Sequence, residues 1–233
     1  MLLGGFQKLT LIDYPGKVAA TVFTVGCSFR CPFCHNPELV LSRSSQLATQ
    51  SSIEKEFFKF LRKRKEKLEG VCITGGEPTI QPDLIDFIKK IKKRGFLVKL
   101  DSNGSRPDVL KKIISGKMID FIAMDIKNSP RRYNETNGVK TDIERIKLSV
   151  EMIMNSGIPY EFRTTVVPGI HREGDFQEIS AWIKGAKNYY LQEYREIKIL
   201  DPRLKKITKN KKIDLEKIKK DVEKFFGFVG IRR

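Results

Sequence analysis

The sequence predicts an α/β protein whose parallel strands form a partial (β/α)6, TIM-like barrel. Short apolar runs alternate with amphipathic stretches along most of the 233 residues, which is the pattern of repeated strand–helix units. Several amphipathic stretches begin with Pro, Ser, Thr or Asp, as helices do. A hydrophobic content of 40% is enough for one well-buried core, and no internal repeat or Ser- or Pro-rich linker divides the chain.

Six apolar runs predict the barrel strands in chain order, at residues 18–25, 71–74, 97–101, 121–125, 160–166 and 189–192. Helical patterns lie between them at residues 52–68, 82–94, 107–115, 141–155 and 175–183. Residues 1–200 are therefore expected to form the barrel. Residues 201–233 are expected to pack on the same domain as a basic connector at 203–212, a helix at 214–225 and a short strand at 228–232.

Composition and charge predict a cytoplasmic protein. No apolar run is long enough to span a membrane, and the N-terminus lacks the basic start and apolar core of a signal peptide. The formal net charge of +17 would attract acidic proteins, anionic ligands or nucleic acid, although no nucleic-acid-binding motif is present. Much of this charge lies in Lys-rich helical runs at 59–67 and 205–219, which are more often solvated faces than binding sites.

Three of the four cysteines, Cys27, Cys31 and Cys34, share one short loop with Cys-x3-Cys-x2-Cys spacing. Three thiolates on one loop can bind three irons of a cubane and leave the fourth iron open to a small molecule. Zinc is the main alternative because His35 could complete a Cys3His site, but it directly follows Cys34 and is poorly placed to close the tetrahedron. A reducing compartment disfavours a disulfide, and Cys72 is read as a small core residue in mid-strand.

Further residues around this loop match those of a known family. Phe33 is an aromatic residue directly before the last cysteine, and the loop follows the first barrel strand. The flanking segments are Cys-His-Asn-Pro-Glu at 34–38 and Leu-Thr-Leu-Ile-Asp-Tyr-Pro-Gly-Lys at 9–17. In these features the chain resembles the radical SAM superfamily, and within it the activating enzymes of glycyl radical enzymes. It is most similar to the activating proteins of anaerobic ribonucleotide reductase.

The resemblance implies a barrel of the radical SAM type and two cofactors, a 4Fe-4S cluster on the three cysteines and S-adenosyl-L-methionine on its open iron. Phe33 and His35, beside the cluster, are then expected to contact the cofactor. After the second strand, Gly75 and Gly76 permit close backbone approach to a ligand, and the Glu77 carboxylate can accept from an ammonium group. By resemblance, the backbone carbonyls of this turn hold the amino group of the methionine.

Polar side chains also follow the third and fourth strands, where a parallel barrel collects its reactive groups. Asp101, Ser102 and Asn103 end the third strand, and Asp125 and Lys127 end the fourth. The two aspartates would repel each other unless a cation or Lys127 lay between them. The resemblance implies a monovalent cation at Asp101, Ser102 and Asp125, with Ser102, Asn103, Asp125 and Lys127 also close to S-adenosylmethionine.

The fifth and sixth strands supply the remaining candidates for cofactor binding. Arg163 projects toward the barrel mouth, and its planar guanidinium suits the carboxylate of the cofactor's methionine. The alternative for Arg163 is an ion pair with Glu161 or Glu77. Val166 is expected to give the adenine an apolar wall, and Gln192 to reach the ribose or the base edge.

The resemblance also implies an activity. An external one-electron reductant such as flavodoxin or ferredoxin would reduce the cluster, S-adenosylmethionine would be cleaved, and a hydrogen atom would be taken from a glycine of a partner glycyl radical enzyme. Two alternatives remain open at this point. One is a radical SAM enzyme that acts on a small molecule or on RNA, and the other is a zinc-binding module without turnover.

Overall fold

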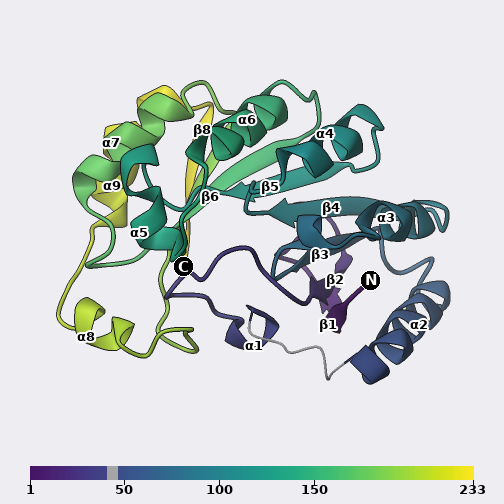
Figure 1. Cartoon of the computed structure of the whole chain (residues 1–233). Helices are drawn as coiled ribbons and strands as arrows, with labels where there is room; N and C mark the ends of the chain where they lie inside the picture. Colours follow the sequence, from purple (N-terminus) through teal and green to yellow (C-terminus); the bar gives the residue numbers. More distant parts are fainter. Residues whose placement is uncertain (41–46) are drawn as a thin grey trace.

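A curled, eight-stranded sheet forms the centre of the molecule (Figure 1). The computed structural model describes residues 1–40 and 47–233, and it describes the side chains of residues 1–40 and 52–233. The strands lie side by side in chain order. All neighbouring pairs are parallel except the first, which is antiparallel. The strands are β1 Leu3–Thr10, β2 Ala19–Thr24, β3 Gly70–Gly75, β4 Leu97–Ser102, β5 Phe121–Asp125, β6 Tyr160–Val166, β7 Asn188–Glu193 and β8 Phe228–Arg232.

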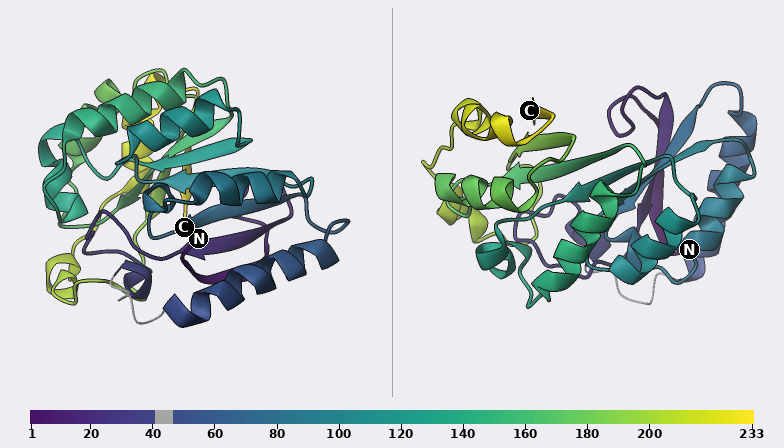
Figure 2. Two further views of the ribbon diagram at one scale, coloured as in Figure 1. Left: turned by 45° about the vertical axis from the view of Figure 1, so that its right-hand side comes forward. Right: turned by 90° about the horizontal axis from the view of Figure 1, so that it is seen from above.

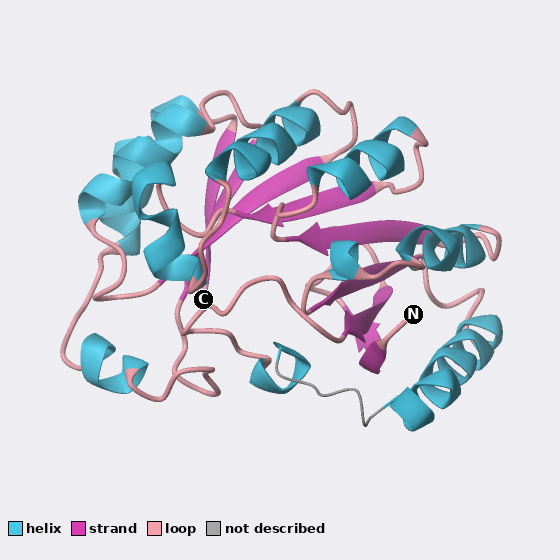
Figure 3. Ribbon diagram, in the orientation of Figure 1, coloured by secondary structure: helices cyan, strands magenta, loops and turns pink. Residues whose placement is uncertain are grey.

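From β2 onward, helices connect successive strands and cover the outer face of the sheet (Figure 3). None of the described helices combines the length and the apolar character needed to cross a lipid bilayer. The α-helices are α1 Pro37–Val40, α2 Leu47–Lys63, α3 Leu84–Lys92, α4 Pro107–Ser115, α5 Tyr133–Asn137, α6 Ile143–Met154, α7 Glu173–Trp182, α8 Leu204–Thr208 and α9 Leu215–Val222.

Local sequence explains where several of these helices begin and end. The Asp142 carboxylate accepts from the Glu144 N–H at the start of α6, and Asp214 does the same for two N–H groups at the start of α9. Helix α5 ends at Gly138, whose φ of 74° is a left-handed conformation that glycine adopts without strain. These caps separate the helices from the strands at positions that the sequence marks.

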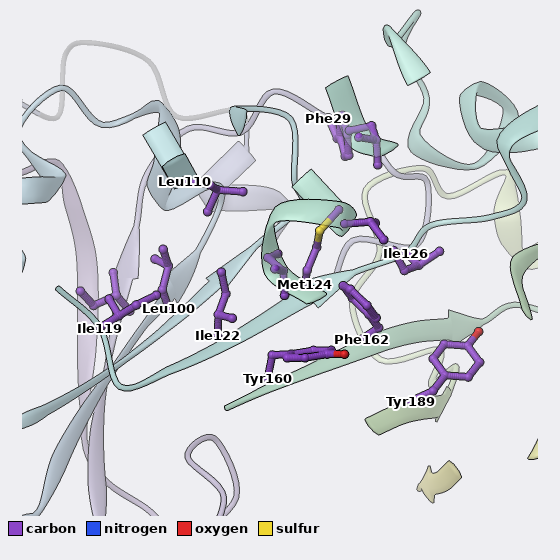
Figure 4. Close-up of a cluster of buried hydrophobic side chains, with 14 of the residues drawn as sticks. Phe29, Leu100, Leu110, Ile119, Ile122, Met124, Ile126, Tyr160, Phe162 and Tyr189 are labelled. Atoms are coloured by element: carbon purple, nitrogen blue, oxygen red, sulfur yellow. The ribbon is translucent and has the colours of Figure 1, made fainter. Parts of the chain in front are cut away.

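The two faces of the sheet differ because side chains alternate along each strand. Leu100, Met124 and Phe162 point outward and form the apolar core beneath the helices (Figure 4). Their neighbours in sequence, among them Asp101 and Asp125, lie on the concave face. The concave face therefore carries charge in the middle of the protein, and the convex face carries the hydrophobic core.

The barrel is incomplete, as predicted, and its two edges remain apart. Figure 2 shows β1 with α2, in purple and blue, at one edge and β8 with α9, in yellow, at the other. Strand β8 pairs in parallel with β7, and α9 contacts β7, β8 and α7. The expected helix and final strand at the C-terminal end of the sequence are both present, and the short α8 lies within the expected basic connector.

The six predicted strands are all found, and β1 is an addition to the prediction. Six of its eight residues are exposed or half-buried, and two of these six are glycines. Such a strand lacks the continuous apolar run by which buried parallel strands are recognised. It pairs with β2 through an irregular antiparallel register, so the sheet is mixed at this edge.

Replacing Phe87 tests how far the packing of α3 against α2 stabilises the fold. Phe87 is 1% exposed, and its ring stacks on that of Phe57 at 5.8 Å between centroids. We expect Phe87→Ala to lower the free energy of unfolding by about 3–5 kcal/mol because it leaves a cavity. Phe228→Ala, at a ring that is 51% exposed, should cost less than about 1 kcal/mol in the same denaturant titration. Equal losses would contradict this account of the core.

Candidate active site

A cavity opens at the carboxyl ends of the parallel strands and brings most of the predicted site residues together. Its volume is about 200 Å³, and it is open to solvent on one side. Its lining consists of Cys27, Phe29, Cys31, Phe33, Cys34, His35, Asn36, Val40, Thr74, Gly75, Gly76, Glu77, Pro78, Asp101, Ser102, Asn103, Asp125, Lys127, Arg163 and Thr165.

Two predicted cofactor contacts, Val166 and Gln192, lie outside this lining. Arg163 and Thr165 line the cavity, so the alternation along β6 turns Val166 to the opposite face, where it is 2% exposed. Val166 instead borders a separate hollow together with Tyr194. Gln192 is paired with Thr165 on the concave face, but it is one strand farther from the cysteines. Contact of Val166 with the adenine, and of Gln192 with the ribose or the base edge, stays a prediction.

The cysteine loop is held by backbone hydrogen bonds to distant segments. Arg30 N–H donates to the Asn137 carbonyl at 2.8 Å, and Asp201 N–H donates to the Pro32 carbonyl at 3.0 Å. Phe29, between the first two cysteines, is 2% exposed and packs edge-on against Tyr133. The loop is therefore anchored by its main chain and by one buried ring, which leaves the three thiols directed at the cavity.

Two of the three thiols, those of Cys27 and Cys31, are buried groups whose neutral form is favoured. Burial raises the pKa of Cys27 to about 11 and that of Cys31 to about 12. A thiol with such a pKa becomes a stable thiolate only when a metal compensates its charge, and metal binding then releases the proton. The donor chemistry of the loop therefore fits a metal cluster.

The zinc alternative would need His35 as a fourth ligand, whereas a cubane needs only the three cysteines, each on a different iron. His35 is engaged elsewhere, since its Nε2 lies 2.9 Å from the Arg195 carbonyl oxygen and its ring stacks on Tyr194.

Gly75 and Gly76 allow two segments of the protein's own backbone to come close together. A Cβ on Gly76 would lie 2.0 Å from the Gly26 carbonyl oxygen, and one on Gly75 would lie 2.3 Å from the Thr24 nitrogen. Glu77 N–H donates to that same Gly26 carbonyl at 2.8 Å. The two glycines therefore let the end of β3 seat the start of the cysteine loop, in addition to lining the cavity.

Glu77 ties the end of β4 to the end of β3. Its carboxylate is 1% exposed and accepts hydrogen bonds from the Thr79 N–H at 3.0 Å, the Ser102 hydroxyl at 2.9 Å and the Asn103 N–H at 2.6 Å. Burial raises its pKa. These contacts satisfy a buried polar group, and contact of Glu77 with an ammonium group stays a prediction.

Asn103 connects this turn to the cysteine loop. Its Nδ2 donates to the Ser28 hydroxyl at 3.0 Å and lies 3.8 Å from the Cys27 sulfur. Its Oδ1 accepts from the Ser105 N–H at 3.0 Å. Asn103 therefore orients the first cysteine, and it also faces the cavity as the sequence predicted.

An ion-pair network covers the floor of the cavity and continues along the concave face. The Arg163 guanidinium bridges the two aspartates, with Nε 2.9 Å from Asp125 Oδ1 and Nη1 3.1 Å from Asp101 Oδ2. Lys127 pairs with Asp125 at 3.0 Å, and Lys99 pairs with Asp101. These partners lower the pKa of both aspartates, and the aspartates raise that of Arg163.

This arrangement counts against a monovalent cation at Asp101, Ser102 and Asp125. The Arg163 guanidinium lies between the carboxylates where the cation was expected, and Ser102 donates to Glu77. The network extends from Arg163 to Glu161 and from Glu161 to Arg232. Its described members are three carboxylates and four basic side chains, so its net charge is +1. An additional cation would be repelled, whereas an anionic ligand would be attracted.

Three residues that the sequence analysis gave no role support this floor. Lys99 is 1% exposed, and a lysine inside a buried strand is a rare placement that could have marked it as an ion-pair partner. His171 is buried, and its Nε2 lies 2.8 Å from the Lys127 carbonyl while Nδ1 accepts from the Val167 N–H. Burial lowers the pKa of His171, so it acts as a neutral brace for the segment that carries Lys127. Arg232 is considered below.

Comparison with known proteins identifies the family. The radical SAM superfamily model matches residues 21–183, which include the cysteine loop and the ends of the next four strands. The chain belongs to the radical SAM superfamily. Enzymes of this superfamily use a 4Fe-4S cluster and S-adenosylmethionine, and the three thiols at one cavity fit that cluster.

Relatives narrow the family further. A protein of Methanocaldococcus jannaschii that bears a provisional name as a glycyl-radical enzyme activating enzyme is 32% identical, over 99% of this chain and 95% of its own length. The pyruvate formate-lyase-activating enzyme of Clostridium pasteurianum is 25% identical, over 93% of this chain and 88% of its own. These matches support a radical SAM enzyme of the glycyl-radical-enzyme activating group.

A solved structure agrees with the fold. Streptococcus suis SuiB bound to S-adenosylmethionine superposes with a TM-score of 0.64 at 16% identity and covers 88% of this chain. The chain spans about half the length of SuiB, at 48%. At this identity the likeness concerns the barrel alone.

Gly76→Ala tests the contact between the cysteine loop and β3. The added methyl group would meet a backbone carbonyl that cannot move aside, so we expect the free energy of unfolding to fall by about 2 kcal/mol. Gly174→Ala, in α7, adds the same methyl group where no atom lies within 4 Å and should change stability by less than about 1 kcal/mol. Denaturant unfolding measures both, and similar values for the two variants would refute the close approach.

Proposed function

We propose that this enzyme activates a glycyl radical enzyme by taking a hydrogen atom from one of its glycines. The observation that carries the proposal is the placement of three thiols and one guanidinium around a single open cavity. When bound, the cluster and S-adenosylmethionine supply the electron and the radical that the reaction needs. The chain's own residues bind and orient these groups and leave one side open to the partner.

The three cysteines hold the cluster in this proposal, and the surrounding residues keep their positions. Cys27 is oriented by Asn103, and Phe29 and the main chain anchor the loop. Each thiol loses its proton when the cluster assembles. Phe33 is 5% exposed and packs in the core cluster, so it shields the loop from water more than it offers a ring to the cofactor.

Arg163 binds the methionine carboxylate of the cofactor in this proposal. Within the described residues, Nε and Nη1 of Arg163 donate to aspartates, and no acceptor is found for Nη2. The Arg163 side chain is 12% exposed and lines the cavity, so Nη2 is open to a ligand there. The net charge of +1 in the network favours a carboxylate there. In this proposal Arg163 keeps its ion pairs with Asp101 and Asp125 and also binds the carboxylate of the cofactor.

The substrate is a glycine of a large partner enzyme, and anaerobic ribonucleotide reductase is the partner we propose. The relative from M. jannaschii aligns along nearly the whole of both chains, which supports activation of a glycyl radical enzyme. The four cysteines are too few for a second cluster in addition to the one on the loop. A flavodoxin or ferredoxin supplies the electron from outside.

Substitution of the cysteines tests the cluster assignment. We expect Cys27→Ala, Cys31→Ala and Cys34→Ala each to abolish retention of iron and sulfide, because each removes one of three anchors. Cys72→Ala is the matched control, since Cys72 is buried on β3 beside Lys99 and outside the cavity. Visible absorption and metal analysis of protein prepared without oxygen provide the measurement. A loop variant with full iron content would contradict the assignment.

Incubation with a partner tests the activity itself. The enzyme, a reductant, S-adenosylmethionine and the anaerobic ribonucleotide reductase should give an organic radical signal on the partner in electron paramagnetic resonance. A partner variant with alanine at the radical glycine should give none, because the methyl group hinders the close approach that a glycine Cα allows. 5'-Deoxyadenosine that instead rises with a small molecule or RNA, without any protein radical, would refute the proposal.

A further inference from the structure

The last strand of the sheet reaches the ion-pair network through one side chain. Arg232 on β8 donates from Nη1 and Nη2 to the two oxygens of Glu161 at 2.8 and 2.7 Å. The guanidinium also lies over the Tyr190 ring, 3.7 Å from its centroid. Glu161 is 2% exposed, so this two-point contact satisfies a carboxylate that water does not reach.

Glu161 has a second basic neighbour, which is the residue proposed to bind the cofactor. Arg163 Nη1 lies 3.9 Å from Glu161 Oε1, while it donates to Asp101 at 3.1 Å. Arg163 therefore lies between the Glu161–Arg232 ion pair and the two aspartates at the floor of the cavity. The direction of its guanidinium depends on whether Glu161, Asp101 or Asp125 lacks another basic partner.

Removing the Arg232 charge would leave Glu161 as an unpaired buried carboxylate. Such a group costs several kcal/mol, and the nearest cation that can relieve it is Arg163. The guanidinium would then turn toward Glu161 and away from Asp101 and Asp125. Without Arg232 the net charge of the network would also fall from +1 to zero, which weakens its attraction for an anion.

We propose that Arg232 is a positioning residue for cofactor binding: by occupying Glu161, it keeps the Arg163 guanidinium directed at the cavity. This inference rests on the proposed function, because it assumes that Arg163 meets the carboxylate of S-adenosylmethionine. It gives β8 a role in the active site although β8 lies two strands from β6.

A set of substitutions separates this role from simple attachment of β8 to the sheet. Arg232→Met should raise the dissociation constant for S-adenosylmethionine about tenfold, which corresponds to about 1.4 kcal/mol. In the double variant Glu161→Gln with Arg232→Met, the carboxylate that competes for Arg163 is gone and the net charge of the network returns to +1. The double variant should therefore bind within about twofold of the wild type, although it lacks the same ion pair.

Arg233→Met is the matched control. It removes the same charge from the adjacent residue, but Arg233 is 58% exposed at its side chain and pairs with Glu216 outside the network. Affinity is measured by equilibrium binding to protein with equal iron and sulfide content, and denaturant unfolding is recorded for every variant. The change in Arg232→Met should appear in affinity and in KM, while the rate at saturating cofactor stays within about twofold of the wild type.

Three outcomes would overturn the inference. In the first, Arg232→Met binds S-adenosylmethionine as tightly as Arg233→Met does. In the second, the double variant binds S-adenosylmethionine as weakly as Arg232→Met, which is the result that a purely structural role of Arg232 predicts. If Arg232→Met lost its cluster or did not fold, the double variant and Arg232→Lys would decide, because one removes the competition and the other keeps the charge. Wild-type protein that carried the cluster and bound no S-adenosylmethionine would refute the proposed function, and this inference with it.

Discussion

The buried guanidinium of Arg163 must be neutralised where it stands, and this requirement organises the concave face of the sheet. Asp101 and Asp125 approach it from two neighbouring strands, and Lys99 and Lys127 then compensate those carboxylates. A charge in such surroundings is stable only as a member of a complete set. The set carries one positive charge in excess, and Arg163 and Lys127 are its basic members at the cavity.

Close backbone contact serves the same cavity from the other side. Gly76 and Gly26 touch so closely that no side chain fits between them, and the Glu77 carboxylate then fastens the next strand end to this contact. Three segments that are far apart in sequence are held as one unit by these contacts. The cysteine loop therefore has a rigid support even though it is irregular in structure.

Sequence reasoning succeeded for groups whose chemistry is local. The three cysteines are close in sequence and lie at one cavity, and the six apolar runs form the strands that were expected. It did not give the partners that come from other strands, because a spacing along one chain does not give distances between strands. The hydrogen bonds that Glu77 accepts from Ser102 and Asn103, and the position of Arg163 between Asp101 and Asp125, are examples. Val166 lies outside the lining of the cavity, so its contact with adenine stays a prediction.

The sequence by itself determined the barrel, the cysteine loop and the family to which the enzyme belongs. These follow from periodicity and from short motifs, in which the informative residues are neighbours in the chain. The tertiary structure alone decided which charges pair, which acceptors are already occupied and that β8 contributes Arg232 to the site. Electrostatic pairing depends on distances of a few ångströms between residues such as Glu161 and Arg232, and only the folded sheet brings those residues together.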